Sequence, residues 1–175
     1  MVRRTRLFIA TSLDGYIAGP GGALDWLFTD DGDGDGYGYD PFIAGVDTLA
    51  MGRRTYETVA GFGAWPYDGM AAWVFTRGTP PEDPRVRFTA ETPREWCAAR
   101  AVEAGRDIWI VGGGELVGGF LDAQLVDDVT IAIHPVLLGG GIPLIPPGTH
   151  RHALRLVASR QYRSGLVLLS YAVQR

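Results

Sequence analysis

Three adjacent glycines follow a short apolar run in residues 107–120, which read DIWIVGGGELVGGF. The run is typical of a strand buried on both faces, and an apolar, helix-compatible stretch follows the glycines. Glycine lets a ligand lie against backbone amides, and the first N–H groups of a helix attract an anionic group such as a pyrophosphate. We therefore expect Gly112, Gly113 and Gly114 to form a phosphate-binding turn. A tight turn without a ligand is the alternative.

Two more predicted strand ends carry groups that suit phosphate. Residues 46–58, VDTLAMGRRTYET, predict a buried strand that ends at Gly52 and a helix that opens with two arginines and a threonine. A second hydroxyl and arginine stand at the end of the strand predicted over 71–76. Guanidinium groups hold phosphate oxygens in bidentate pairs, and a hydroxyl adds a hydrogen bond. The residues concerned are Arg53, Arg54, Thr55, Thr76 and Arg77.

The order of strands and helices predicts the fold, and the fold predicts where these groups lie relative to one another. The predicted strands cover residues 7–13, 16–18, 46–51, 71–76, 86–89, 107–111, 126–136, 154–160 and 166–173, and the predicted helices cover 53–60, 93–104 and 114–123. This alternation predicts one α/β domain over 1–175, with a mostly parallel sheet and an antiparallel C-terminal hairpin. Ligands of such sheets bind at the carboxyl ends of the strands, where all three clusters lie. A phosphorylated dinucleotide would use more than one of them.

Composition narrows the function classes. The net charge of −4 argues against a nucleic-acid or anionic-membrane partner, and no apolar span of membrane length is present. All 16 basic residues are arginine, so lysine chemistry and a G-x-x-x-x-G-K-[ST] phosphate loop are excluded. Cys97 is the single cysteine, which favours a reducing cytoplasm. We expect residues 30–40, DDGDGDGYGYD, to form a surface loop.

Five segments in sequence carry a family resemblance. They are SLDGYIAG (12–19), MGRRTYE (51–57), VFTRG (74–78), IVGGGELVGGFL (110–121) and HPVLLGGGIPLIP (134–146). Together they resemble the dihydrofolate-reductase-like superfamily, and most of all the C-terminal reductase domain of bacterial bifunctional riboflavin-biosynthesis deaminase-reductases. The resemblance implies a three-layer α/β/α fold with a mixed, mostly parallel sheet of about eight strands. It also implies that NADPH lies along one edge of that sheet.

The resemblance implies cofactor-binding roles by matching position. Ala10 and Ile17 would line the nicotinamide, and the arginines and threonine at the start of the helix 53–60 would meet the phosphates. Thr76 and Arg77 would lie by the adenosine 2′-phosphate, which favours NADPH over NADH. The pyrophosphate and the nicotinamide ribose would follow a continuous stretch made of Val111, Gly112, Gly113, Gly114, Glu115, Leu116 and Val117.

The sequence also departs from the family pattern. A folate reductase holds a carboxylate on its first helix, whereas the candidates here, Asp30 and Asp31, border a glycine-rich loop without a predicted helix. Trp26 is the candidate for contact with the substrate. The riboflavin-pathway enzyme carries a zinc deaminase domain, and one cysteine cannot supply its ligands.

We therefore expect an NADPH-dependent reductase of a small heterocyclic substrate, similar to the 5-amino-6-(5-phosphoribosylamino)uracil reductase domain. A dihydrofolate reductase and a nucleotide-binding homologue without activity are the alternatives. The apolar edge of the C-terminal hairpin, LVLLSYAV at 166–173, offers a surface that a second copy of the chain could cover. A homodimer is therefore the candidate assembly.

Overall fold

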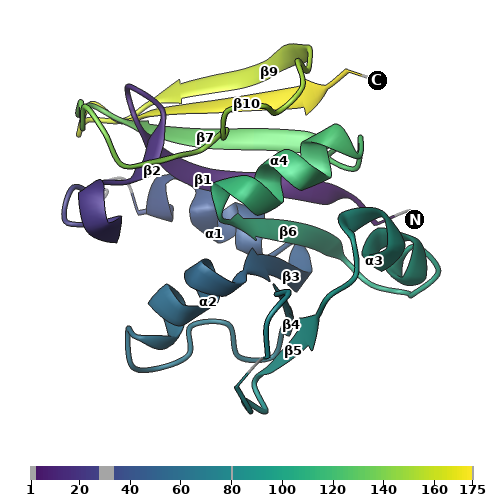
Figure 1. Cartoon of the computed structure of the whole chain (residues 1–175). Helices are drawn as coiled ribbons and strands as arrows, with labels where there is room; N and C mark the ends of the chain where they lie inside the picture. Colours follow the sequence, from purple (N-terminus) through teal and green to yellow (C-terminus); the bar gives the residue numbers. More distant parts are fainter. Residues whose placement is uncertain (1–2, 28–33, 80, 175) are drawn as a thin grey trace.

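The computed structural model describes residues 3–27, 34–79 and 81–174. Within them the large sheet is built from β1 (Thr5–Ser12), β3 (Val46–Gly52), β4 (Ala71–Phe75), β5 (Val86–Thr89), β6 (Asp107–Gly112), β7 (Asp128–His134), β9 (Leu154–Gln161) and β10 (Val167–Val173). These eight strands lie in the order β5-β4-β3-β6-β1-β7-β10-β9 (Figure 1). The first six run parallel to one another, and β10 pairs antiparallel with both β7 and β9. The mixed sheet with an antiparallel C-terminal hairpin is confirmed.

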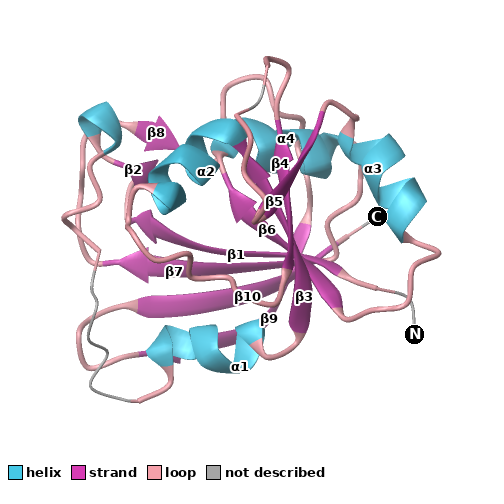
Figure 2. Ribbon diagram, turned by 90° about the horizontal axis from the view of Figure 1, so that it is seen from below, coloured by secondary structure: helices cyan, strands magenta, loops and turns pink. Residues whose placement is uncertain are grey.

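A smaller sheet and the helices complete the described part of the chain. The strands β2 (Tyr16–Ala18) and β8 (Ile142–Pro143) pair antiparallel, near the carboxyl ends of β1 and β7 (Figure 2). The α-helices are α1 (Tyr39–Ile43), α2 (Arg53–Ala60), α3 (Pro93–Arg100) and α4 (Gly114–Asp122), and two 3₁₀ turns cover Pro20–Gly22 and Gly36–Gly38. No helix among the described residues has the length and apolar character needed to cross a bilayer.

Two hydrophobic clusters cover the two faces of the large sheet. Side chains alternate between faces along each strand, so Leu7 and Ile110 face one cluster while Phe8 and Trp109 face the other. Helices α3 and α4 bury Trp96, Val117 and Phe120 in the first cluster. Helices α1 and α2 bury Phe42 and Tyr56 in the second. This arrangement confirms the three-layer α/β/α prediction, and Figure 2 shows α1 on one side of the sheet and α3 and α4 on the other.

Some predicted boundaries were wrong. Helix α3 begins as expected, with a capping box between Thr92 and Glu95, but it ends at Arg100 rather than at residue 104. Residues 101–106 are exposed, so a longer helix would have no buried face to stabilise it. The segment 30–40 was predicted as a loop, yet a 3₁₀ turn and the start of α1 occupy 36–40; residues 28–33 lie outside the described part.

Candidate functional site

The three predicted phosphate-binding clusters lie side by side. In the sheet Met51 pairs with Gly112, so the end of β3 adjoins the end of β6. Gly52 pairs with Phe75, so the end of β4 adjoins β3 on its other side. The segments that follow these strands therefore leave the sheet from one rim, which we call the carboxyl rim (Figure 2). This adjacency is what a ligand with several phosphate groups requires.

Each of the three glycines in the β6–α4 turn has its own physical role. Gly112 has φ of +140°, which L side chains rarely adopt. The amide of Gly113 donates to the Thr55 hydroxyl oxygen at 2.9 Å, which ties the turn to the first turn of α2. A Cβ on Gly114 would come within 2.4 Å of the Pro143 carbonyl oxygen. The turn is thus shaped by backbone conformation and close packing as well as by any ligand.

The start of α4 presents its amides without a side-chain cap. Gly113 is the N-cap residue and makes no side-chain hydrogen bond to the first turn. Glu115 is exposed, so its carboxylate can point away from an anion near the helix start. Leu116 is half-buried, while the side chain of Val117 is fully buried in the first cluster. Val117 as a whole is 0% exposed, and its amide donates to the Gly113 carbonyl at 3.0 Å, so it lies beneath the surface that a cofactor could contact.

Arg53 reaches the turn after β4. Its Nε donates to Glu57 at 2.8 Å and its Nη1 donates to the Thr79 carbonyl at 3.1 Å. In the same turn the Gly78 amide donates to the Thr76 hydroxyl oxygen at 3.3 Å. One arginine of the α2 start and the Thr76–Arg77 pair therefore share one small surface, although 22 residues or more separate them in sequence.

A groove runs between α2 and the 3₁₀ turn that follows β2. Its volume is about 560 Å³, within the range of small-molecule sites, and its lining residues are Gly21, Gly22, Arg54, Glu57, Thr58 and Ile142. Of these residues, only Arg54 was expected from the sequence to contact a ligand. Glu57 and Thr58 lie three and four residues after Arg54, so all three share one face of α2. This helical spacing is the signal in the sequence from which Glu57 and Thr58 could have been predicted.

The residues expected near the nicotinamide border the same rim. Ala10 is half-buried near the end of β1, and Ile17 on β2 packs against the first cluster. Asp14 lies in the β1–β2 turn, and its carboxylate accepts the amides of Leu138 and Gly139 at 3.1 and 2.7 Å. Hydrogen bonds from Ser12 and then from these amides hold the pKa of Asp14 below its ordinary value. The ionised Asp14 thus fixes the 137–139 turn beside β2.

Of the residues expected near the substrate, the structure describes Trp26 but not Asp30 and Asp31. Trp26 is half-buried, and its Nε1 donates to the Ala23 carbonyl at 3.2 Å. Its ring meets that of His134 edge to face at 5.2 Å. Burial lowers the pKa of His134, so this imidazole is neutral at pH 7. The candidate acids Asp30 and Asp31 lie outside the described residues.

Comparison with known proteins identifies the family. The model of the family described as RibD C-terminal domain matches residues 68–168. The uncharacterized protein YwjB of Bacillus subtilis is 42% identical over 171 residues, which cover 96% of this chain and 97% of YwjB. The chain belongs to the RibD C-terminal domain family.

Solved structures agree with this assignment. A protein of Shewanella sp. PV-4 that is assigned to riboflavin biosynthesis superposes on this RibD C-terminal domain protein with a TM-score of 0.88, 31% identity and full coverage of both chains. A dihydrofolate reductase of Enterococcus faecalis, solved in complex with NADP(H), superposes with a TM-score of 0.74 and 17% identity, again over both whole chains. The latter likeness shows the fold, and it confirms the predicted dihydrofolate-reductase-like architecture.

Proposed function

We propose that this protein is an NADPH-dependent reductase that transfers hydride to a C=N or C=O bond of a small heterocyclic substrate. The observation that carries the proposal is the adjacency of the three clusters at the carboxyl rim, where Arg53 reaches the Thr76–Thr79 turn. Family membership supports a substrate similar to 5-amino-6-(5-phosphoribosylamino)uracil. The dihydrofolate reductase neighbour holds NADP(H) on the same fold.

The residues at the rim fit a phosphorylated dinucleotide. Arg53, Thr76 and Arg77 would hold the 2′-phosphate, because they offer two guanidinium groups and a hydroxyl on one surface. Arg54 and the uncapped amides of α4 would hold the pyrophosphate. The nicotinamide would lie against Ala10 and Ile17. Its ribose would follow the backbone of Gly52, Val111, Gly112, Gly113, Gly114, Glu115 and Leu116, and the buried Val117 would support this stretch from beneath.

The cofactor would supply the hydride, and the protein would orient it toward the substrate. We propose that water or the substrate itself supplies the proton. A dihydrofolate reductase would instead need an anchored carboxylate as the proton relay. Asp30 and Asp31 remain the candidates for that role, with Trp26 as the candidate substrate contact.

Calorimetric titration with NADPH and NADH tests the phosphate assignment. We expect NADPH to bind more tightly, and Arg77→Ala to weaken NADPH by about tenfold while leaving NADH unchanged, since only NADPH carries the 2′-phosphate. Arg151→Ala is the matched control, because Arg151 is exposed and its neighbours His150 and His152 bond Asp122 at the far end of α4. Equal affinities for both coenzymes, unmoved by the substitution, would remove Arg77 from the site.

Oxidation of NADPH in the presence of pterins, ribosylaminopyrimidines and quinoid compounds tests the activity itself. Turnover with one of these classes is the expected result and would name the substrate class. Tight NADPH binding without turnover on any of them would favour the alternative of a nucleotide-binding homologue.

We propose further that residues 1–175 act as one domain, that two copies form a homodimer, and that the protein works in the cytoplasm. The sequence predicted the free edge at 166–173, which was wrong, because β10 pairs with β7 on one side and β9 on the other. The edge strand is β9, all of whose residues are exposed, and Leu156 and Val157 are 52% and 59% exposed. An uncovered apolar edge favours association. Light scattering should show a dimer that Leu156→Glu dissociates, whereas Val102→Glu, at a site 88% exposed on another surface, should leave it intact.

A further inference from the structure

Two tyrosine side chains from separate elements pack against one indole ring. Tyr39 opens α1, and Tyr67 lies in the loop between α2 and β4. Each phenol ring lies 5.6 Å from the ring of Trp109, at interplanar angles of 65° and 90°. The Trp109 Nε1 donates to the Phe8 carbonyl at 3.0 Å, which fixes the indole. A ring anchored to the sheet therefore holds both phenols in place.

Both hydroxyl groups are available to a ligand. Within the described residues, neither the Tyr39 nor the Tyr67 hydroxyl has a hydrogen-bond partner, and both side chains are half-buried. Tyr56 in the same cluster differs, because its hydroxyl donates to Asp83 at 2.7 Å. Burial and then the Asp40 carboxylate raise the pKa of Tyr39, and burial and then the Tyr39 phenol raise the pKa of Tyr67. Both hydroxyls are therefore protonated donors at neutral pH. Half-buried donors without a partner favour binding of an acceptor.

The pair lies close to the positions assigned to the nicotinamide. Ala10 follows Phe8 by two residues on the same face of β1, and Val111 follows Trp109 in the same way on β6. Two residues of a strand advance by about 7 Å toward the carboxyl rim. A ring system bound over the phenols would therefore lie within one ring's length of a nicotinamide on Ala10.

The charges around this cluster disfavour an anionic ring. The Arg6 guanidinium lies 4.9 Å from the Phe42 ring, but it is paired with Asp107 at 3.2 Å and Asp128 at 3.5 Å. Arg85 lies over the Trp65 ring and is held by Asp83 at 2.6 Å. Both arginines that border the second hydrophobic cluster, to which Tyr39 and Tyr67 belong, are thus already neutralised by carboxylates. The cluster offers aromatic surface and two neutral donors.

We propose that the hydroxyls of Tyr39 and Tyr67 form a two-donor anchor for the ring of the substrate. The ring it selects is a planar heterocycle that carries carbonyl or ring-nitrogen acceptors and no charged group of its own. This inference deepens the proposed function and rests on it for the role of the bound ring as hydride acceptor. Both tyrosines are positioning residues, because they orient the ring through hydrogen bonds and edge contacts.

Calorimetry with lumazine, an uncharged pteridinedione, tests the anchor without any coenzyme. We expect Tyr39→Phe and Tyr67→Phe each to raise the Kd of lumazine by about tenfold, and the double variant to raise it further. Tyr171→Phe is the matched control, since this half-buried tyrosine of β10 packs against the first cluster and should bind lumazine as the wild type does. A 6-carboxylated lumazine should bind more weakly than lumazine to the wild type.

Three results would overturn the anchor: no binding of lumazine to the wild type, unchanged affinity in a double variant with wild-type Tm, or tighter binding of the carboxylated ring. NADPH titration of the same variants keeps the two proposals apart, because the tyrosine variants should bind NADPH normally. A wild type that binds lumazine through these hydroxyls but ignores NADPH would overturn the proposed function and leave the anchor standing.

Discussion

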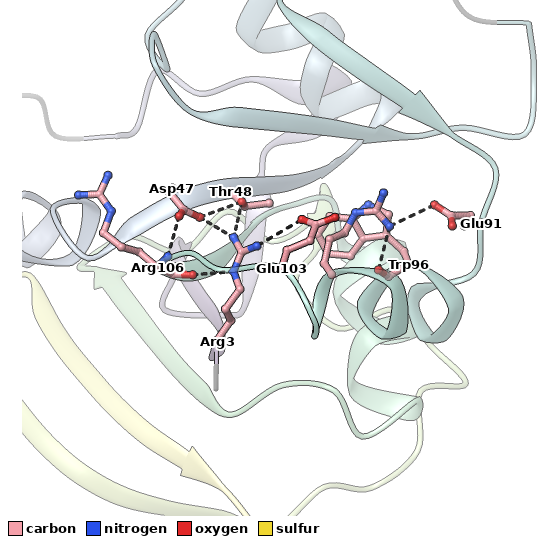
Figure 3. A network of polar contacts seen from close by, with 8 residues as sticks. Arg3, Asp47, Thr48, Glu91, Trp96, Glu103 and Arg106 are labelled. Atoms are coloured by element: carbon pink, nitrogen blue, oxygen red, sulfur yellow. Dashed lines mark hydrogen bonds and ion pairs between the residues drawn. The ribbon is translucent and has the colours of Figure 1, made fainter. Parts of the chain in front are cut away.

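Arginines gather at both ends of the parallel strands, but the two ends hold them differently. At the amino end the Arg3 side chain is only 5% exposed, and its guanidinium donates to Asp47 at 2.5 Å, the Thr48 hydroxyl at 2.5 Å and the Arg106 carbonyl at 2.8 Å (Figure 3). At the carboxyl rim, Arg54 and Arg77 are exposed, and within the described residues neither guanidinium has an ion-pair partner. The guanidinium at the amino end is therefore satisfied by protein groups, while those at the carboxyl rim keep their donors and charge free for a ligand.

The contrast separates arginines that stabilise the fold from arginines that suit a ligand. A buried guanidinium must be paired, because an isolated buried charge is strongly unfavourable. An exposed, unpaired guanidinium adds little to stability and keeps its donors for phosphate. Arg53 lies between these cases, since it pairs with Glu57 on the surface while it also reaches the Thr76–Thr79 turn. Whether an arginine is assigned to the fold or to a ligand site therefore depends on its partners in the structure and not on the residue type alone.

The largest effect should come from removing Arg3. Arg3→Ala leaves the carboxylate of Asp47 without its guanidinium partner, and it removes the donors to Thr48 and Arg106. Breaking a buried pair costs about 3 kcal/mol in the free energy of unfolding. Urea denaturation of wild type and variant measures this difference.

Two matched variants sharpen that result. Arg4 pairs with Asp128 but is 54% exposed, so Arg4→Ala should cost less than about 1 kcal/mol. Arg77→Ala should leave the free energy of unfolding unchanged. If Arg77→Ala destabilised the protein as much as Arg3→Ala, the distinction between the two ends would fail.

The glycine triplets at 112–114 and 139–141 allow a second comparison, in which the expected change in stability is smaller. An added methyl on Gly114 would lie 2.4 Å from the Pro143 carbonyl oxygen, which is backbone and cannot move away easily. Gly114→Ala should therefore lower the free energy of unfolding by about 2 kcal/mol through overpacking. Gly140→Ala is the control, because no atom lies within 4 Å of its added Cβ and its φ is not positive. Equal stability of the two variants in thermal or urea unfolding would contradict the packing account.

The sequence predicted the elements whose stability is local or periodic. The buried runs that became β3 and β6, the capping box at Thr92 and the two helices at the rim follow from patterns of neighbouring residues. It did not predict α1 or β8. Helix α1 has five residues, YDPFI, and is stabilised by burying Phe42 on the second face of the sheet. The two residues of β8 form a strand only because β2 lies beside them.

The site shows the same division between local and distant causes. The adjacency of the three candidate phosphate-binding clusters could be predicted because it depends on residue types next to the ends of parallel strands. The reason for Gly114 could not, because it is a contact with Pro143, 29 residues later in the chain. The Tyr39 and Tyr67 pair likewise depends on Trp109, which brings two distant segments to one ring. Such residues become visible only when the fold is known.

The smallest effect concerns acid stability of the amino end. Burial alone would raise the pKa of Asp47, but the Arg106 amide, the Thr48 hydroxyl and the guanidinium of Arg3 outweigh it, so this pKa lies below the ordinary 3.8. A carboxyl with a lowered pKa in the folded state stabilises the protein at a pH above its unfolded pKa, and this contribution is lost as pH falls through the folded pKa. The difference in free energy of unfolding between wild type and Asp47→Asn should therefore stay constant from pH 7 to about pH 5 and shrink below about pH 4. Asp25→Asn serves as control, since Asp25 is exposed and its side chain makes no ion pair within the described residues. A difference for Asp47→Asn that grew on acidification would mean that the amino end gains nothing from the ionised carboxylate, and the contrast with the carboxyl rim would lose its electrostatic basis.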